Sequence, residues 1–345
     1  MARSGDPALT RRALLTRVGR VCLGAATFSL AEWLVACAPT LTRPSATLRP
    51  TAVSQPTPTP DTRPVSIAIT GDIMLGRSVN SQILASADRF PFNYTADYLS
   101  GFDLTVGNLE CVVSKLGQPV PNKPFDFRAD PKGFARLTRA GFDVVSLANN
   151  HSGDYGSGAY VDMLAQLPDH GLTALGGGMN LTLAHQPVVK TVRSTTVGFL
   201  AYCEIGPFSF AATRTSPGHA WLDPALMQSD IAATRPHVDF LVVFMHWGIE
   251  YDHGVSGHQQ AMARLAIDAG ADFVVGSHPH VVQAPGAYAS KPIVYSLGNF
   301  VFDQMWSDDV RRGEVLTLMV QGSQLLSWSL RQSYIAGDLG QPQWA

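Results

Sequence analysis

Apolar, β-type runs that stop at a polar or charged residue recur along this chain and limit the folds it can adopt. One run covers residues 65–70 and stops at Gly71 and Asp72, and another covers 102–107 and stops before Asn108 and Glu110. Amphipathic helical segments alternate with such runs, and β-hairpin patterns follow after residue 280. This order predicts a layered α/β domain with mixed β-sheets over residues 65–345.

Three further runs end in an amide or in histidines. Run 142–147 leads to Asn150 and His151, run 238–245 to His246, and run 271–275 to His278 and His280. Ligands of open α/β sheets gather at the carboxyl ends of the strands. We therefore expect side chains from five distant segments to form one cluster.

The chemistry of the expected cluster is that of a metal site. Carboxylates, an Asn carbonyl and imidazoles suit divalent ions such as Zn, Mn, Fe or Mg. Each residue alone has a structural alternative: Asp72 or Glu110 could cap a helix, and His246 or His278 could be an ordinary core or surface histidine. The whole set at successive strand ends favours the metal site.

The same residues lie in short sequence blocks, and these blocks follow one another in the order found in a known protein family. These blocks are Gly71-Asp-Ile-Met-Leu-Gly-Arg77, Gly107-Asn-Leu-Glu110, Phe125-Asp-Phe-Arg128, Ala148-Asn-Asn-His-Ser-Gly-Asp-Tyr-Gly156, His246-Trp-Gly-Ile-Glu-Tyr251, Gly276-Ser-His-Pro-His280 and Tyr295-Ser-Leu-Gly-Asn-Phe-Val-Phe-Asp303. The chain thus resembles the CapA, or poly-γ-glutamate capsule biosynthesis, family, which is related to the calcineurin-like metallophosphoesterases. The resemblance implies a metallophosphoesterase-type sandwich of two mixed β-sheets flanked by helices.

The resemblance also implies roles for the clustered residues. It makes Asp72 the first metal-binding acid, Glu110 the bridging carboxylate, Asn150 the amide ligand, His246 and His278 further ligands of one metal, His280 a ligand of the other, and His151 the catalytic histidine. One position departs from the superfamily, because Met74 stands where a second histidine ligand is usual. A thioether is a poor ligand for these ions, so the number of ions, one or two, stays open.

Three cations near these blocks are candidates for holding an anionic substrate. Arg77, Lys123 and Arg128 could grip carboxylate or phosphate groups, or could simply be solvated surface charges. We expect Trp247, Tyr251 and Phe300 to serve as wall and core.

The net charge excludes one class of partner. Beyond residue 36 the chain carries 25 acidic and 20 basic side chains, whereas non-specific binding to nucleic acid needs a surplus of Lys and Arg. Nucleic acid is therefore not an expected partner.

The N-terminal segment has the features of an export signal. Residues 1–36 combine Arg11 and Arg12, which resemble a twin-arginine motif, with an apolar stretch too short for a membrane span. Leu34-Val-Ala-Cys37 resembles a lipobox, so we expect lipidation of Cys37; a plain membrane anchor or an ordinary signal peptide is the alternative. Residues 37–64 are rich in Pro and Thr, which predicts a disordered tether. We expect an extracytoplasmic, membrane-anchored lipoprotein.

Two cysteines remain in the predicted domain. Cys111 and Cys203 could form a disulfide in an exported protein, or could be two buried thiols, and we favour the thiols.

Three functions are compatible with these features. The first is a metal-dependent hydrolase or transferase acting on a phosphoester or a γ-linked amide polymer. The second is a non-catalytic accessory that binds an anionic capsule polymer, together with a membrane synthase or export complex. The third is a lipoprotein scaffold that binds no metal. The sequence leaves enzymatic activity open.

Overall fold

The apolar run at the start of the predicted domain forms an interior strand of the larger sheet. In this computed structural model, which describes residues 61–86 and 89–345, the run is strand β1, Val65–Ile73. It pairs in parallel with β2, Leu104–Leu109, and antiparallel with β18, Arg312–Gln321. Since both edges of β1 are paired, every residue in it except Ser66 is buried.

The larger sheet is mixed. Among the described residues its order is β20-β19-β18-β1-β2-β5-β6, and β17 pairs with the carboxyl end of β1. The pairs from β17 to β6 are parallel, whereas β18, β19 and β20 are antiparallel. Its other strands are β5 Val144–Ser146, β6 Thr173–Leu175, β17 Asn299–Val301, β19 Gln324–Ala336 and β20 Gln341–Trp344.

The second sheet has the order β14-β15-β12-β11-β9-β8 within the same described ranges. Its strands are β8 Val188–Val192, β9 Thr195–Cys203, β11 Phe240–His246, β12 Phe273–Ser277, β14 Gly286–Tyr288 and β15 Lys291–Val294. Short two-stranded pairs lie outside both sheets: β3 Val112–Val113 with β4 Arg128–Ala129, β7 Gly177–Gly178 with β10 Gly218–His219, and β13 Val282–Gln283 with β16 Ser296–Leu297.

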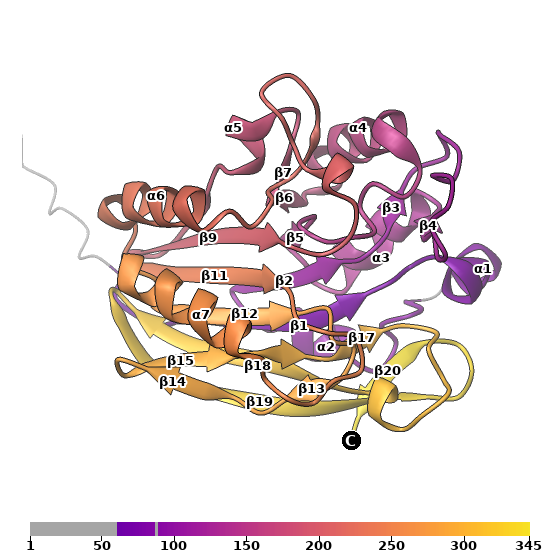
Figure 1. Cartoon of the computed structure of the whole chain (residues 1–345). Coiled ribbons are helices and arrows are strands. Elements are labelled where there is room, and N and C mark those ends of the chain that lie inside the picture. The colour runs from indigo at the N-terminus through magenta and orange to yellow at the C-terminus, as the bar shows by residue number, and fades with distance from the viewer. Residues whose placement is uncertain (1–60, 87–88) are drawn as a thin grey trace, which may run out of the picture. The chain divides into compact units, whose positions relative to one another are not determined.

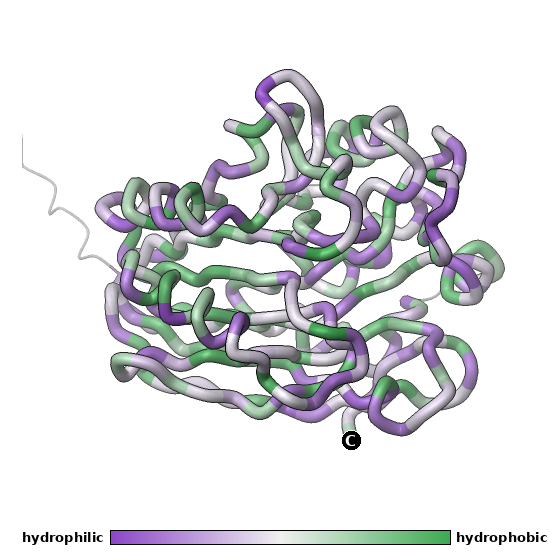
Figure 2. Tube along the Cα trace, in the orientation of Figure 1, coloured by the Kyte–Doolittle hydropathy of each residue, from purple (hydrophilic) through white to green (hydrophobic). Residues whose placement is uncertain are grey.

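The two sheets face each other across a shared hydrophobic core. Ile67 and Val106 of the larger sheet belong to the same buried cluster as Phe199 and Val242 of the second sheet. Because strand residues alternate between faces, Ala68 points to the other side and packs in a second cluster with helical residues. Figure 2 shows hydrophobic residues along the central strands and hydrophilic residues mainly in loops.

Helices cover the outer faces of the sandwich. Helices α1, α3 and α4 contribute to the cluster on the larger sheet, and α6 and α7 to the cluster on the second sheet, where α6 lies by β9 and α7 by β12 (Figure 1). The helices are α1 Arg77–Ala85, α2 Ala96–Leu99, α3 Lys132–Arg139, α4 Gly156–Gln166, α5 Leu181–Ala184, α6 Pro224–Thr234 and α7 Gly257–Ala269. The predicted sandwich of two mixed sheets flanked by helices is confirmed.

One predicted helix is shorter than expected. The amphipathic pattern of the sequence predicts a helix over 158–170, whereas α4 covers Gly156–Gln166 and a separate 3-10 turn covers Pro168–His170. Proline has no backbone N–H and restricts the residue before it, so a regular helix ends here.

The predicted signal segment 1–36, the lipidation site Cys37 and most of the tether lie outside the described residues. The last tether residues, 61–64, lie against the folded domain: the Asp61 carbonyl accepts hydrogen bonds from the Ser194 backbone N–H (3.2 Å) and Oγ (2.8 Å). In the part of the chain that the structure describes, no helix is both long and apolar enough for a membrane span.

Candidate metal centre

The register of the strands brings the predicted ligands to the carboxyl ends of both sheets. In the larger sheet Asp72 of β1 lies between Asn299 of β17 and Asn108 of β2. In the second sheet His246 of β11 lies beside Ser277 of β12. Strand pairing therefore places these polar residues in two rows at one end of the sandwich.

A glycine sets the position of Asp72. A Cβ atom at Gly71 would lie 2.0 Å from the Gly298 carbonyl oxygen, so only glycine allows the two backbones to approach this closely. The next residue, Asp72, donates its backbone N–H to the same carbonyl at 3.0 Å. This close approach holds the Asp72 side chain in the row with Asn299.

The Asp72 carboxylate is held by surrounding groups. Its Oδ1 accepts a hydrogen bond from Asn108 Nδ2 at 2.8 Å, and its Oδ2 accepts one from the His278 backbone N–H at 3.2 Å. His280 Nδ1 lies 3.4 Å from Oδ2 and 2.9 Å from Asn299 Oδ1. The Asp72 carboxylate is thus fixed by contacts to two other segments, β2 and the loop that carries His278 and His280.

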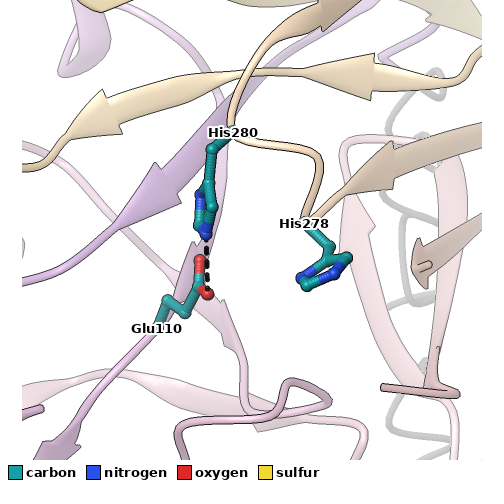
Figure 3. Close-up of side chains that lie close together, drawn as sticks. All are labelled: Glu110, His278 and His280. Atoms are coloured by element: carbon teal, nitrogen blue, oxygen red, sulfur yellow. Dashed lines mark ion pairs between the residues drawn. The ribbon is translucent and has the colours of Figure 1, made fainter. Parts of the chain in front are cut away.

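Glu110 has no such contacts. Its side chain is fully buried, and neither carboxylate oxygen has a hydrogen-bond partner among the described residues. The nearest ionisable groups to Oε1 are His280 Nε2 at 3.8 Å and His246 Nε2 at 3.9 Å (Figure 3 shows Glu110 facing His280). Burial, and then the negative charges of Asp72 and Glu250, raise the pKa of Glu110 well above its usual value. A buried carboxylate without partners is costly unless a cation balances it.

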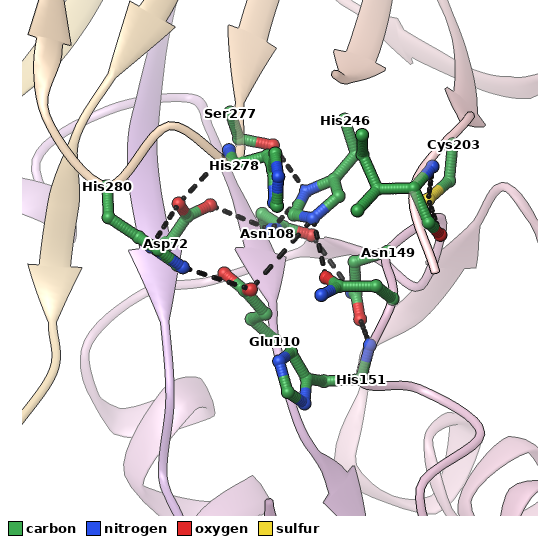
Figure 4. A network of polar contacts seen from close by, with 12 residues as sticks. Asp72, Asn108, Glu110, Asn149, His151, Cys203, His246, Ser277, His278 and His280 are labelled. Carbon is green, nitrogen blue, oxygen red and sulfur yellow. Dashed lines mark hydrogen bonds and ion pairs between the residues drawn. The ribbon is translucent and has the colours of Figure 1, made fainter. Parts of the chain in front are cut away.

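Two of the clustered histidines, His246 and His278, are neutral. His246 Nε2 lies 2.8 Å from Asn150 Oδ1 and its Nδ1 lies 3.0 Å from Ser277 Oγ, while the buried His278 Nδ1 has no partner among the described residues (Figure 4). Burial, and then neighbouring histidines, lower the pKa of His246 and of His278 well below the usual value. A neutral imidazole is the form that binds metals.

Two overlapping groups of side chains could hold an ion. One consists of Glu110, His278 and His280, the other of Asp72, Glu110 and His246; within each group the ligand atoms lie within 4.8 Å of one another. Both groups contain Glu110, whose two oxygens lack partners. This donor set of carboxylates and imidazoles suits a divalent cation.

The loop that carries two of these histidines has an unusual backbone. His278 has a φ of 96° and His280 a φ of 58°, both in the left-handed region that non-glycine residues seldom adopt. Such conformations cost about 1–3 kcal/mol each and concentrate at functional sites. The fold therefore keeps both imidazoles in place against a local backbone preference.

His151 lies beside this cluster with its own partners. Its Nδ1 is 2.7 Å from Asp154 Oδ2 and 2.8 Å from Lys123 Nζ, and its ring stacks on Phe127 at 3.9 Å between centroids. A proton on Nδ1 is donated to Asp154; without that proton, Nδ1 accepts from Lys123. Burial, which outweighs the effect of Asp154, lowers the pKa of His151 to about 4. The ring is neutral at pH 7.

The three predicted substrate cations already have partners in the protein. Lys123 is paired with Asp154, and only 11% of its side chain is exposed. Arg77 is paired with Asp303, and Arg128 lies 4.3 Å from the centroid of the Tyr155 ring. The structure places Lys123 at His151 itself and leaves the predicted contact with a substrate a prediction.

Met74 and the two cysteines belong to the interior. Met74 is fully buried, and its sulfur accepts a hydrogen bond from the Gly76 backbone N–H at 3.0 Å. Cys111 and Cys203 are free, buried thiols, as the favoured alternative predicted, and burial raises the pKa of Cys111 to about 12. Trp247 and Phe300 are buried as expected.

Sequence reasoning did not identify several residues that organise the site. Asn108 and Asn299 orient Asp72 and His280, and Asp154 orients His151. All three lie inside the sequence blocks quoted above, and Asp154 follows His151 by three residues. Their position in the blocks was the available signal, but which atoms they contact depends on the fold.

Comparison with known proteins places this geometry in a family. The family model described as "Bacterial capsule synthesis protein PGA_cap" matches residues 66–304, a range that contains every predicted metal ligand. The chain belongs to the PGA_cap family. The family resemblance expected from the sequence blocks is therefore confirmed.

A curated relative and two solved structures show how far the similarity extends. The PGA biosynthesis protein CapA of Bacillus subtilis is 33% identical over 245 residues, which are 70% of this chain and 64% of the relative. The chain spans less than two thirds of the first curated relatives it matches. A hypothetical protein of Thermus thermophilus has a similar fold, with a TM-score of 0.50, 15% identity and coverage of 77% of this chain and 98% of that protein. The calcineurin-like phosphoesterase YfkN of Bacillus subtilis matches with a TM-score of 0.48, 16% identity and coverage of 81% and 93%.

Proposed function

We propose that this protein uses a divalent metal ion to hydrolyse a γ-glutamyl polymer during capsule synthesis. The observation that carries the proposal is Glu110, a buried carboxylate with two unpartnered oxygens that belongs to both groups of candidate ligands. The choice of polymer rests on the relative from Bacillus subtilis, whose name refers to PGA biosynthesis, and on the description of the family as capsule synthesis proteins.

The proposed metal ligands are the residues whose side chains meet at the strand ends. They are Asp72, Glu110, Asn150, His246, His278 and His280. A divalent ion held there would act as a Lewis acid toward an oxygen of the substrate. It would also lower the pKa of a bound water molecule. The protein's own contribution is to orient these donors, since Asn108, Ser277 and Asn299 each contact one of them.

His151 is the proposed proton carrier. Its pKa of about 4 makes the ring neutral at pH 7, so one ring nitrogen can accept a proton and the other can donate one. Asp154 lies on Nδ1 and would stabilise the protonated ring, while stacking on Phe127 holds its plane. These contacts support a role for His151 in receiving a proton and passing it to a leaving group.

The test combines metal content with turnover. Protein purified without chelators is analysed for Mn, Fe, Zn and Mg, loaded with Mn²⁺, and incubated with poly-γ-glutamate and with a generic phosphodiester. We expect bound metal and shortening of the polymer, and His151→Asn should keep the metal but lose turnover. Asp268→Asn, an exposed change in the last turn of α7, is the control. Metal-loaded protein that leaves both substrates intact would contradict hydrolysis.

A second candidate function is a non-catalytic accessory that binds the same polymer. Met74, which stands at a usual ligand position and is buried with its sulfur hydrogen-bonded, favours this role. In that case polymer binding survives His151→Asn and no shortened products form with any variant.

The location of the protein is a separate proposal. We infer export through the segment 1–36 and lipid attachment at Cys37, on the grounds of the twin arginines and the lipobox-like sequence alone. Membrane fractionation of cells that express the full chain or Cys37→Ala tests it. The wild-type chain should be in the membrane fraction, and the variant should be released.

A further inference from the structure

Two exposed aromatic rings form a corner beside the His280 end of the site. Tyr251 and Trp306 have ring centroids 5.4 Å apart and planes at 80°, and 42% and 63% of these residues are exposed. The Tyr251 ring lies 6.1 Å from that of His280. Large aromatic side chains this exposed, next to a polar site, are typical of ligand contacts.

The position of this corner is fixed by the loop beside it. Tyr251 has a φ of 64°, and its backbone N–H donates to the Pro279 carbonyl at 2.8 Å, between the two candidate ligands His278 and His280. Gln304 Nε2 donates to the Tyr251 hydroxyl at 3.3 Å. The corner is therefore attached to the backbone that carries the metal ligands.

A carboxylate adds negative charge to the corner. Glu250 is exposed and directly precedes Tyr251 in the chain; after burial, its negative charge contributes to raising the pKa of Tyr251 and of Glu110. Two aromatic faces and a carboxylate are the groups that bind an ammonium ion, through cation–π attraction and charge pairing. The cations Lys123 and Arg77, by contrast, lie by His151 and its stacking partner Phe127.

We propose that Glu250, Tyr251 and Trp306 bind the free α-ammonium group at the amino end of a γ-glutamyl chain whose first γ-carbonyl lies at the metal ligands. In such a unit four bonds of about 1.5 Å separate the amino nitrogen from the γ-carbonyl carbon, a reach of about 5 Å. The Tyr251 ring of this corner lies at a comparable distance from the His280 ring, 6.1 Å between centroids.

Charge makes this recognition specific for one end of the chain. Each internal nitrogen of a γ-glutamyl polymer is a neutral amide, so only the terminal unit offers an ammonium group. The inference rests on the proposed function, because it assumes that the ligand is a γ-glutamyl chain.

The test compares two ligands that differ only in this group. Full-length Mn²⁺-loaded protein is titrated calorimetrically with a γ-glutamyl pentamer that has a free amino end and with the same pentamer acetylated there. We expect the free pentamer to bind about tenfold more tightly. The variants Glu250→Gln and Trp306→Ala should each reduce this preference, without weakening binding of the acetylated pentamer to the same extent.

Matched controls are available on the surface. Tyr94→Ala, which removes an aromatic side chain of 64% exposure, is the control for Trp306→Ala. Asp268→Asn, which removes an exposed carboxylate charge, is the control for Glu250→Gln. Both controls should keep the tenfold preference. Equal binding of the two pentamers by the wild-type protein would overturn the inference and leave the proposed polymer binding intact. If neither pentamer binds, the proposed function fails and the inference fails with it.

Discussion

Two carboxylates at opposite ends of the β-sandwich, Asp103 and Glu110, have opposite surroundings. At the amino end of β1 and β2, Arg193 donates to both carboxylate oxygens of Asp103, at 3.0 and 2.6 Å, and to the Pro64 carbonyl at 3.0 Å. At the carboxyl end, Glu110 is more deeply buried and has no hydrogen-bond partner among the described residues. Charges that hold the fold are paired within it, whereas Glu110 is left for a ligand.

The pKa shifts have opposite directions at the two ends. The hydrogen bonds from Arg193 lower the pKa of Asp103 despite some burial. Burial raises the pKa of Glu110, and the nearby negative charges add to the shift. The contrast predicts that substitutions at one end change stability and that substitutions at the other end change metal binding.

The largest expected effect is on metal affinity at the carboxyl end. Glu110→Gln removes the charge shared by both candidate ligand groups, and we expect Mn²⁺ affinity to fall on the order of a hundredfold. Isothermal titration with Mn²⁺ measures this loss. In chelator the variant should unfold at the same temperature as wild type or higher, because a neutral amide is less costly to bury than a charge.

The control variant for the Glu110→Gln experiment removes a carboxylate charge at the amino end. Asp103→Asn should bind Mn²⁺ as tightly as the wild-type protein does. If the two substitutions weaken Mn²⁺ binding equally, the contrast between the ends is wrong.

The second effect is on stability at the amino end. Arg193→Met removes partly buried, charge-assisted hydrogen bonds to Asp103, and we expect a loss of about 1–3 kcal/mol in the free energy of unfolding. Urea denaturation in chelator measures it. Unchanged stability in this variant would show that the pairing at this end does not support the fold.

A smaller effect is the pH dependence of the same ion pair. Because the folded pKa of Asp103 is lowered, its contribution to stability is fully present above the unfolded pKa of about 3.9 and is lost as pH falls through the lower folded value. The stability difference between wild type and Arg193→Met should therefore shrink below about pH 4. Denaturation curves at pH 7 and at pH 3 test this, and a difference that grows at pH 3 would contradict it.

The smallest expected effect is on two buried thiols at the carboxyl end of the strands, Cys111 next to Glu110 and Cys203 beside His246. In a protein carrying Cys22→Ser and Cys37→Ser, the remaining Cys111 and Cys203 should react with a thiol reagent only after unfolding, because both are buried and burial raises their pKa values. Absorbance of the released reagent counts the thiols. Fast reaction under native conditions would mean that the interior opens.

Much of the fold was predictable because hydrophobic periodicity reflects burial. The sequence pattern predicts helices over 224–234 and 257–269, and α6 and α7 have these bounds, because the capping residues Asp223 and Ser256 precede them. Short strands such as β6, Thr173–Leu175, were not predicted, because three residues are too few to show the alternation of apolar and polar side chains that marks a strand. The run near 293–297 is divided between β15 and β16 in different sheets, which a continuous apolar pattern does not reveal.

The candidate ligands were predictable for a related reason. Parallel strands end on the same side of a sheet, so the residues that follow them meet, and Asp72, Glu110 and His246 could be grouped before any coordinates were considered. The identity of their partners was not predictable in this way. Asn299 contacts His280 only because β17 pairs with the end of β1 and Gly71 allows the close approach.

By itself, the sequence determined which chemical groups the site contains and at which end of the sheets they lie, because side-chain type and strand direction are local properties. The tertiary structure alone decided which of those groups are satisfied and which remain open. Lys123 was one of three equivalent cations in the sequence and is now paired with Asp154 beside His151. Glu110 was one acid among several and now has no partner among the described residues, because pairing and desolvation depend on distances between segments that only packing brings together.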